Sequence, residues 1–247
     1  MNLKEQFQFP YIKRFYFARF ISNFGNGMSP IALAFGILNL PDGDANMLGL
    51  VLGSTTVAML IMSPFGGVLA DKFGRVKAVA FADLVGSAGL FVQVAFFATG
   101  DVPLIVLLLV NINFGLMWGI FWPAMSGVLP ALVPDEHLQG TNSVNNFFSN
   151  GAIILGAAVG GIIVAGWGAT WALAIDAATF TIGGIVLLTF RHVSPASGKT
   201  ENTMIDDLIH GWKLFLSFRW IVIGVFGFSF IVLAWAAGEN ILGPLIA

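Results

Sequence analysis

Four ionisable residues stand inside long apolar stretches of the sequence, where they could carry a proton or bind a charged partner. They are Arg19, Asp83, Asp176 and Glu239. Ionisable side chains are costly inside a membrane unless they are paired or hydrated, so each is a functional candidate. Arg19 and Asp83 lie at similar depths from one side, which predicts a pair with either a static packing role or a coupling role. Asp176 fits either a hydrogen-bonded structural acid or a proton carrier, whereas Glu239 lies near the end of its stretch and can face water.

Amide and indole side chains form a second group that could bind a small molecule. A polar stripe at helical spacing runs through residues 141–150, and shorter polar groups occupy two other apolar stretches. Such groups suit an uncharged or amphipathic ligand held by hydrogen bonds and stacking. The alternative is interhelical hydrogen bonding, worth on average about 0.6 kcal/mol per pair. The predicted cavity residues are Asn23, Asn26, Asn113, Trp118, Trp122, Asn146 and Asn150.

The elements that must position these residues are membrane-spanning helices. Of the 247 residues, 57% are hydrophobic and 10% are charged, against about 25% charged in soluble domains. A span needs about 20 mostly apolar residues. The sequence predicts an all-α polytopic membrane helix bundle with about seven transmembrane helices, near residues 15–39, 47–69, 78–99, 103–126, 141–165, 169–190 and 219–243.

The longest connector divides the chain into three predicted parts. Residues 1–190 form a six-helix domain, residues 191–217 form a connector, and residues 218–247 begin a second domain that is cut short. Apolar residues at helical spacing within the connector, from Met204 to Leu216, predict an amphipathic helix on the membrane surface. The end at Ala247 predicts either a fragment of a longer protein or a chain that needs a second half from a partner.

The basic residues predict the orientation in the membrane. Lys and Arg stay cytoplasmic when they lie in short loops. All eleven fall at the N-terminus, between the second and third spans, or around the long connector, while the opposite loops carry only Asp42, Asp44 and Asp101. We therefore expect a multi-pass protein of the cell membrane with its N-terminus in the cytoplasm.

The turn between the second and third spans carries a recognisable order of residues, Gly67, Asp71, Gly74 and Arg75. This G-x-L-A-D-x-x-G-R pattern resembles the signature loop of the major facilitator superfamily. The resemblance implies a six-helix N-terminal domain with a 3+3 inverted repeat, and a loop that acts in gating. It also implies that the spans near 15–39, 103–126 and 141–165 line the cargo cavity.

Further segments resemble the branch of this family that contains siderophore exporters and macrolide efflux pumps. They are Phe17–Ser22, Trp122–Ala124, Leu129–Pro134, Gly156–Gly161 and Asp176–Phe180. Two positions depart from the family pattern: Asn111 replaces an Arg typical of proton-coupled members, and Ala157 replaces a Pro typical of drug antiporters. Both departures argue against standard proton antiport, although not against transport.

The sequence favours a transporter over an enzyme. It has no Cys, its three His residues lack metal-ligand spacing, and neither a G-x-S-x-G nor a phosphate-loop motif is present. No cofactor, metal or nucleic acid is predicted. We expect an exporter of a small amphipathic molecule, of the drug, macrolide or siderophore class, that works by alternating access driven by a proton or other ion gradient. The alternatives are a lysophospholipid-handling permease and a truncated, non-transporting membrane subunit.

Overall fold

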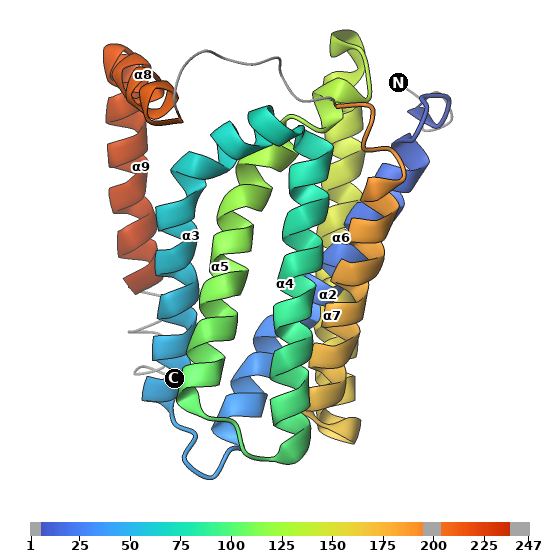
Figure 1. Cartoon of the computed structure of the whole chain (residues 1–247), viewed down its shortest axis with the longest axis vertical. Coiled ribbons are helices and arrows are strands. Elements are labelled where there is room, and N and C mark those ends of the chain that lie inside the picture. The colour runs from blue at the N-terminus through green and yellow to red at the C-terminus, as the bar shows by residue number, and fades with distance from the viewer. Residues whose placement is uncertain (1–5, 195–203, 238–247) are drawn as a thin grey trace. The chain divides into compact units, whose positions relative to one another are not determined.

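The computed structural model describes residues 6–194 and 204–237, and every regular element in them is helical (Figure 1). Two compact units divide the chain at Lys199. The first contains α2 (Ile12–Leu38), α3 (Ala45–Phe73), α4 (Arg75–Thr99), α5 (Leu104–Ser126), the short 3-10 helix η1 (Leu129–Ala131), α6 (Asp135–Trp167) and α7 (Ala169–Leu188). The second contains α8 (Met204–Ser217) and α9 (Arg219–Ala237). The predicted division at residues 190 and 217 stays a prediction, and Glu239 lies outside the described residues.

Single residues set several of the helix boundaries. Gly74 ends α3 and precedes α4 with φ 94°, and Gly168 separates α6 from α7 with φ 91°. Glycine adopts these backbone angles without the steric cost that a Cβ imposes. Asp44 caps α3, because its side chain accepts a hydrogen bond from the Met47 amide at 2.7 Å.

Five helices within the described residues, α3 to α7, are long and apolar enough to cross a bilayer. The pair α8–α9 bends by 92° and would raise the number to six as one broken span. The remaining predicted span corresponds to α2, which has 27 residues but a more polar sequence that includes Arg19, Asn23 and Asn26. The predicted helix in the connector is present as α8, and its position on a membrane surface stays a prediction.

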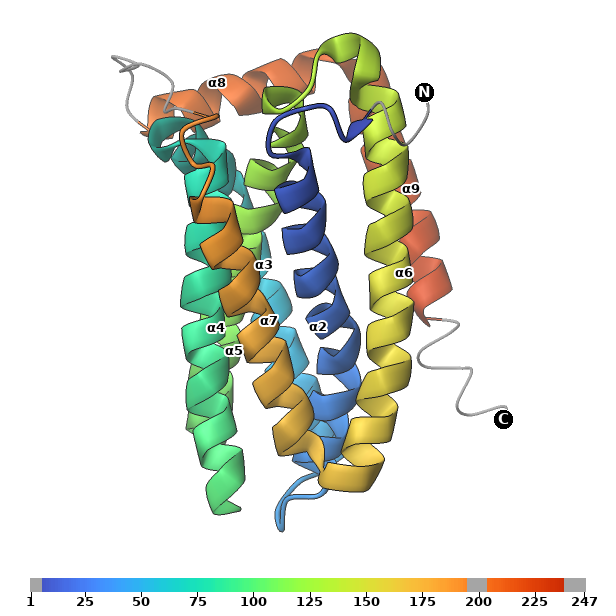
Figure 2. The ribbon, with the colours of Figure 1, turned by 90° about the vertical axis from the view of Figure 1, so that its right-hand side faces the viewer.

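The first unit is built from two three-helix repeats that exchange helices. α4 packs against α7; α2 packs against α6 and α7, while α5 packs against α3 and α4. Exchanging α2, α3 and α4 with α5, α6 and α7 reproduces the same set of contacts, as the 3+3 inverted repeat predicts. Figures 1 and 2 show these six helices side by side, with α6 next to α2 and α3 next to α5.

Glycines allow α6 to approach α2 closely, and α5 to approach α3 closely. A Cβ on Gly156 would collide with the Phe24 carbonyl, and one on Gly160 would lie 2.9 Å from Met28, so α6 and α2 meet backbone to backbone. In the corresponding contact between α5 and α3, a Cβ on Gly115 of α5 would collide with the Thr55 carbonyl of α3. Small residues at such interfaces are typical of helix packing in lipid. Gly156 and Gly160 therefore form a packing seam of α6 against α2.

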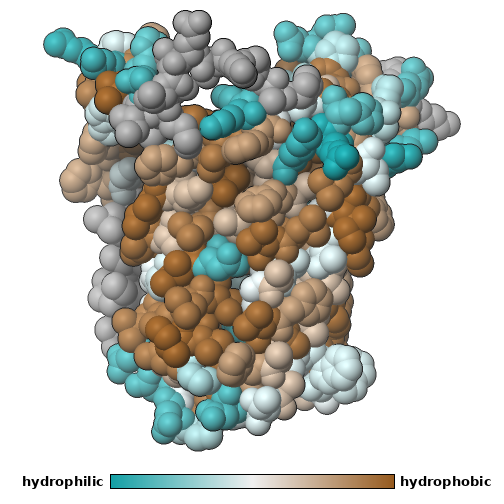
Figure 3. All heavy atoms as spheres, viewed as in Figure 1, coloured by the Kyte–Doolittle hydropathy of each residue, from teal (hydrophilic) through white to brown (hydrophobic). Residues whose placement is uncertain are grey.

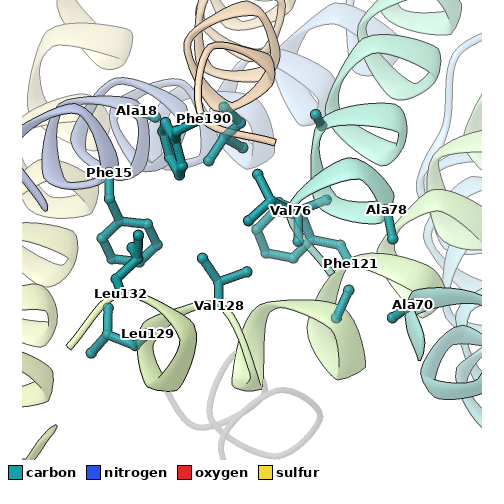
Figure 4. Close-up of a cluster of buried hydrophobic side chains, with 14 of the residues drawn as sticks. Phe15, Ala18, Ala70, Val76, Ala78, Phe121, Val128, Leu129, Leu132 and Phe190 are labelled. Atoms are coloured by element: carbon teal, nitrogen blue, oxygen red, sulfur yellow. The ribbon is translucent and has the colours of Figure 1, made fainter. Parts of the chain in front are cut away.

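Two apolar clusters close the ends of this unit, with polar residues between them. One cluster contains Phe15, Val76 and Phe121 together with η1 (Figure 4), and the other contains Met28, Phe97 and Leu173. Along α2, α4, α5 and α7, the buried polar residues lie between the members of the two clusters. They are Arg19, Ser22, Asn23, Asp83, Ser87, Gln93, Asn111, Asp176 and Thr179. We call this set the polar layer. In the view of Figure 3, hydrophobic residues cover the middle of the visible face and hydrophilic residues gather at its ends.

Candidate functional site

A pocket of about 210 Å³ opens between the helices of the first unit. Residues of α2, α3, α4, α5 and α7 line it, so it involves both repeats. Leu52 and Thr56 are exposed at one end of this lining, and Gln93 is fully buried. The pocket therefore reaches from the surface of the bundle into the polar layer. Its lining consists of Asn26, Ser29, Pro30, Leu33, Leu52, Thr55, Thr56, Leu90, Gln93, Asn111, Phe114, Trp118 and Leu173.

The two most buried amides of the pocket differ in their partners. Asn111 is held on both sides: its Nδ2 donates to the Leu107 carbonyl at 2.9 Å, and its Oδ1 accepts from Thr55 Oγ1 at 3.4 Å. Gln93 is 1% exposed, and neither of its amide atoms has a hydrogen-bond partner in the described part of the chain. Asn111 thus joins α5 to α3, whereas the hydrogen-bonding groups of Gln93 are free.

An aromatic row on α5 connects the pocket to the outside of the bundle. The ring of Trp118 lies 5.4 Å from Phe114 and 6.2 Å from Trp122, and the second contact is T-shaped. Phe114 and Trp118 line the pocket, whereas Trp122 is 54% exposed. Because the three residues follow each other at four-residue spacing, they lie on one face of the helix.

Of the predicted cavity residues, Asn26 and Trp118 line this pocket and the other five do not. Asn113 donates to the Val85 carbonyl at 3.2 Å and so joins α5 to α4. Asn23 is buried and accepts from Arg19 at 3.3 Å. Asn146 and Asn150 are exposed on α6, where Asn150 donates to the Asn146 carbonyl at 2.8 Å. The cavity role of these residues stays a prediction.

Arg19 and Asp83 are both buried in the polar layer, at 6% and 2% exposure. They interact electrostatically across α2 and α4, but no nitrogen–oxygen pair of theirs within 4.0 Å is recorded among the described residues. The Arg19 guanidinium instead lies over the Phe121 ring at 4.9 Å and donates to Asn23. Arg19 thus makes a cation–π contact and a hydrogen bond in place of a direct salt bridge, with the Asp83 carboxyl on the neighbouring helix α4.

Asp176 is completely buried on α7 and faces α2. A Cβ on Gly25 would lie 2.5 Å from its Oδ1, so the carboxyl packs directly over that glycine. Ser29, a pocket residue on α2, lies beside the carboxyl. Within the described ranges, neither carboxyl oxygen meets a hydrogen-bond partner. Asp176 therefore lies next to the pocket, with Ser29 as its polar neighbour.

The turn between α3 and α4 holds an exposed ion pair. Arg75 Nε lies 3.2 Å from Asp71 Oδ1, and the two side chains are 41% and 54% exposed. The same guanidinium covers Gly127 at the end of α5, where a Cβ would collide with it. Gly67 lies near Pro123 of α5, with 3.9 Å between a Cβ there and the proline Cβ. The signature residues thus connect the α3–α4 turn to α5.

Several long apolar helices, a polar layer and a pocket between two helix repeats define a multi-pass membrane protein of the transporter class. Residues 15–245 match the family model described as Major Facilitator Superfamily. The chain belongs to this family of transporters, and its all-helical fold agrees with the prediction from sequence.

Known relatives and a solved structure cover different parts of the chain. The chain is 30% identical over 132 residues to the "Putative bacilysin exporter BacE" of Bacillus subtilis (strain 168). This alignment covers 52% of this chain and 32% of the relative. It is 24% identical over 249 residues to the "Enterobactin exporter EntS" of Shigella boydii serotype 4 (strain Sb227), with 100% and 58% covered. A crystal structure of the peptide transporter POT (E310Q mutant) in complex with sulfate superposes with TM-score 0.64 at 19% identity, covering 96% of this chain and 51% of that one. The last similarity concerns the fold alone. The chain thus spans about a third to three fifths of the length of the relatives it matches.

Proposed function

We propose that this chain belongs to a secondary transporter that exports a small amphipathic molecule by alternating access. The pocket is the observation that carries this proposal. Its lining combines uncharged amides and hydroxyls with the rings of Phe114 and Trp118, a combination that suits a ligand with both polar and apolar parts. The relatives named as exporters of bacilysin and enterobactin support outward transport.

The proposal includes the domain organisation and orientation predicted from the sequence. Residues 1–190 form the N-terminal six-helix domain, residues 191–217 connect it to the second domain, and residues 218–247 begin that domain. Basic residues at the start of α2 and at the α3–α4 turn, and acidic residues in the α2–α3 and α4–α5 loops, support a cytoplasmic N-terminus. A second half would close the transport pathway.

We assign gating to the residues of the α3–α4 turn and ion coupling to the buried ionisable residues. The Asp71–Arg75 pair, with Gly67 and Gly74, holds the cytoplasmic side in one state and exchanges partners as the two halves rock. Arg19, Asp83 and Asp176 are the coupling residues, because buried ionisable groups respond to a proton or other ion gradient. The complete burial of Asp176, beside the pocket residue Ser29, supports its place in this group.

Substrate counterflow in proteoliposomes tests the proposal. The probes are radiolabelled erythromycin, enterobactin and lysophosphatidylcholine. Trp118→Leu should slow the exchange of the transported probe, whereas Trp171→Leu, at an exposed position on α7 outside the pocket lining, should leave it unchanged. Exchange of lysophosphatidylcholine alone would favour the lipid permease, and no exchange of any probe would favour a non-transporting subunit.

A further inference from the structure

Gln93 is a buried polar residue that has no hydrogen-bond partner in the described part of the chain. It lies on α4 between Val92 and Val94, lines the pocket and is 1% exposed. Across the ranges that the structure describes, neither Nε2 nor Oε1 makes a hydrogen bond. Buried polar groups are nearly always hydrogen-bonded, so an exception of this kind calls for an explanation such as a ligand.

The neighbouring amide of Asn111 shows what a purely structural amide in this pocket looks like: it finds its hydrogen-bond partners within the protein. Asn111 faces the same pocket, and both its Nδ2 and its Oδ1 are bonded within the protein. An amide that only joins helices would be expected to resemble Asn111. Within the described residues Gln93 has no such bonds, and its side chain belongs to the pocket lining.

The lining specifies the chemistry of the group that Gln93 would bind. A glutamine amide presents an acceptor and a donor side by side. A primary carboxamide, which carries a donor and an acceptor on the same side, satisfies both at once. The residues of the pocket lining carry no formal charge, and Phe114 and Trp118 place aromatic faces in the same space. Drug-sized ligands occupy pockets of about 300–1,000 Å³, so a pocket of about 210 Å³ suits one aromatic amide group.

We propose that Gln93 is the specificity-determining residue of a subsite that binds an uncharged aromatic amide, either alone or as one part of a larger cargo. The proposal rests on the transport function above, because it names the class of cargo that enters the pocket. Gln93 recognises the amide, Phe114 and Trp118 pack against the ring, and Asn111 keeps α3 and α5 in place around them.

Benzamide and acetophenone are the probes that test this subsite. They have nearly the same shape, but acetophenone carries a methyl group in place of the amide nitrogen and can only accept a hydrogen bond. Their dissociation constants are measured by ligand-observed NMR on the full chain in lipid nanodiscs, with empty nanodiscs correcting for partition into lipid. Benzamide should bind the wild type about tenfold more tightly than acetophenone, the ratio that one net hydrogen bond supplies.

Gln93→Leu should abolish that preference. Benzamide affinity should fall about tenfold more than acetophenone affinity, because leucine removes two hydrogen bonds from benzamide and one from acetophenone. The unfolding temperature should stay the same or rise, because no hydrogen bond among the described residues is lost. Gln93→Met provides a second variant of closer shape. Tyr16→Phe is the control outside the pocket lining: it removes the buried hydrogen bond from the Tyr16 hydroxyl to Gln6 Oε1, so it should lower the unfolding temperature and keep the preference for benzamide.

Equal binding of the two probes to the wild type would overturn the proposal and indicate that water satisfies Gln93. So would a Gln93→Leu variant that unfolds at a clearly lower temperature, or that weakens both probes equally, because Gln93 would then be a packing residue. The measurement needs no transport. Selective benzamide binding without counterflow of any cargo would refute the transport function and leave the subsite, whereas counterflow without amide selectivity would refute only the subsite.

Discussion

Replacing Gly156 with alanine tests the close approach of α6 to α2. The added Cβ would collide with the Phe24 carbonyl oxygen and would lie 2.9 Å from its carbon and 3.2 Å from Phe24 Cα. These are backbone atoms that cannot rotate away, so the two helices must separate. Overpacking of this kind typically costs about 1–3 kcal/mol.

Gly151 on the same helix provides the matched control. A Cβ there has no atom within 4 Å in the described structure. Alanine in a helix interior is favoured over glycine by about 0.5–1 kcal/mol, so Gly151→Ala should raise the free energy of unfolding by that amount. Both variants gain this helix propensity, and it cancels between them. Gly156→Ala should therefore be less stable than Gly151→Ala by about 1–3 kcal/mol, which is the packing cost alone.

The two variants are compared by unfolding in mixed micelles with increasing SDS, followed by tryptophan fluorescence. The free energy of unfolding is obtained for the wild type and each variant under the same conditions. If Gly156→Ala proved as stable as Gly151→Ala, the backbone contact between α2 and α6 would be absent in the membrane, and the reasoning from the glycine seam would fail.

Three further predictions concern the apolar cluster, the buried cation and the gating turn. Phe15→Ala should lower the free energy of unfolding by about 3–5 kcal/mol, because it empties a site that is 1% exposed; a loss below 1 kcal/mol in SDS titration would mean that the cluster repacks. Phe121→Leu and Arg19→Met should show a coupling of about 1–2 kcal/mol in a double-mutant cycle, from the 4.9 Å cation–π contact; additive effects would remove that contact. Asp71→Asn should change stability by less than about 1 kcal/mol, because its ion pair is exposed, while counterflow slows; unchanged counterflow would remove the gating role.

The sequence predicts the helices well and their ends less well. The length of an apolar stretch in the sequence reflects the thickness of the membrane, whereas the helix itself continues beyond that stretch until a residue ends it. The predicted span 47–69 is α3, Ala45–Phe73, which continues through Asp71 and Lys72 to Gly74. The predicted span 141–165 begins six residues earlier as α6 at Asp135, where Asp135 and Glu136 favour the first turn.

The candidate site is harder to predict, because it depends on how each helix is rotated about its axis. A polar residue on an apolar helix can face a pocket or a neighbouring backbone, and its sequence neighbourhood is the same in both cases. The sequence predicts Asn113 in the cavity, and the structure shows its amide donating to the Val85 carbonyl of α4, while its cavity role stays a prediction. Gln93 was not predicted at all, since a single glutamine among apolar residues forms no stripe. Only tertiary packing reveals that its amide is left free.

The exchange of helices between the repeats constrains how the protein is made. α2 leaves the ribosome before α3 to α7, yet its extensive contacts are with α6 and α7, and only minor ones join it to its neighbour α3. The face of α2 that packs against α6 and α7 therefore meets lipid or a helper protein until these two helices enter the membrane. Neither repeat can complete its packing alone, so assembly must wait for late synthesis. We expect nascent chains halted before α6 to be the species that insertion chaperones hold and quality-control proteases recognise.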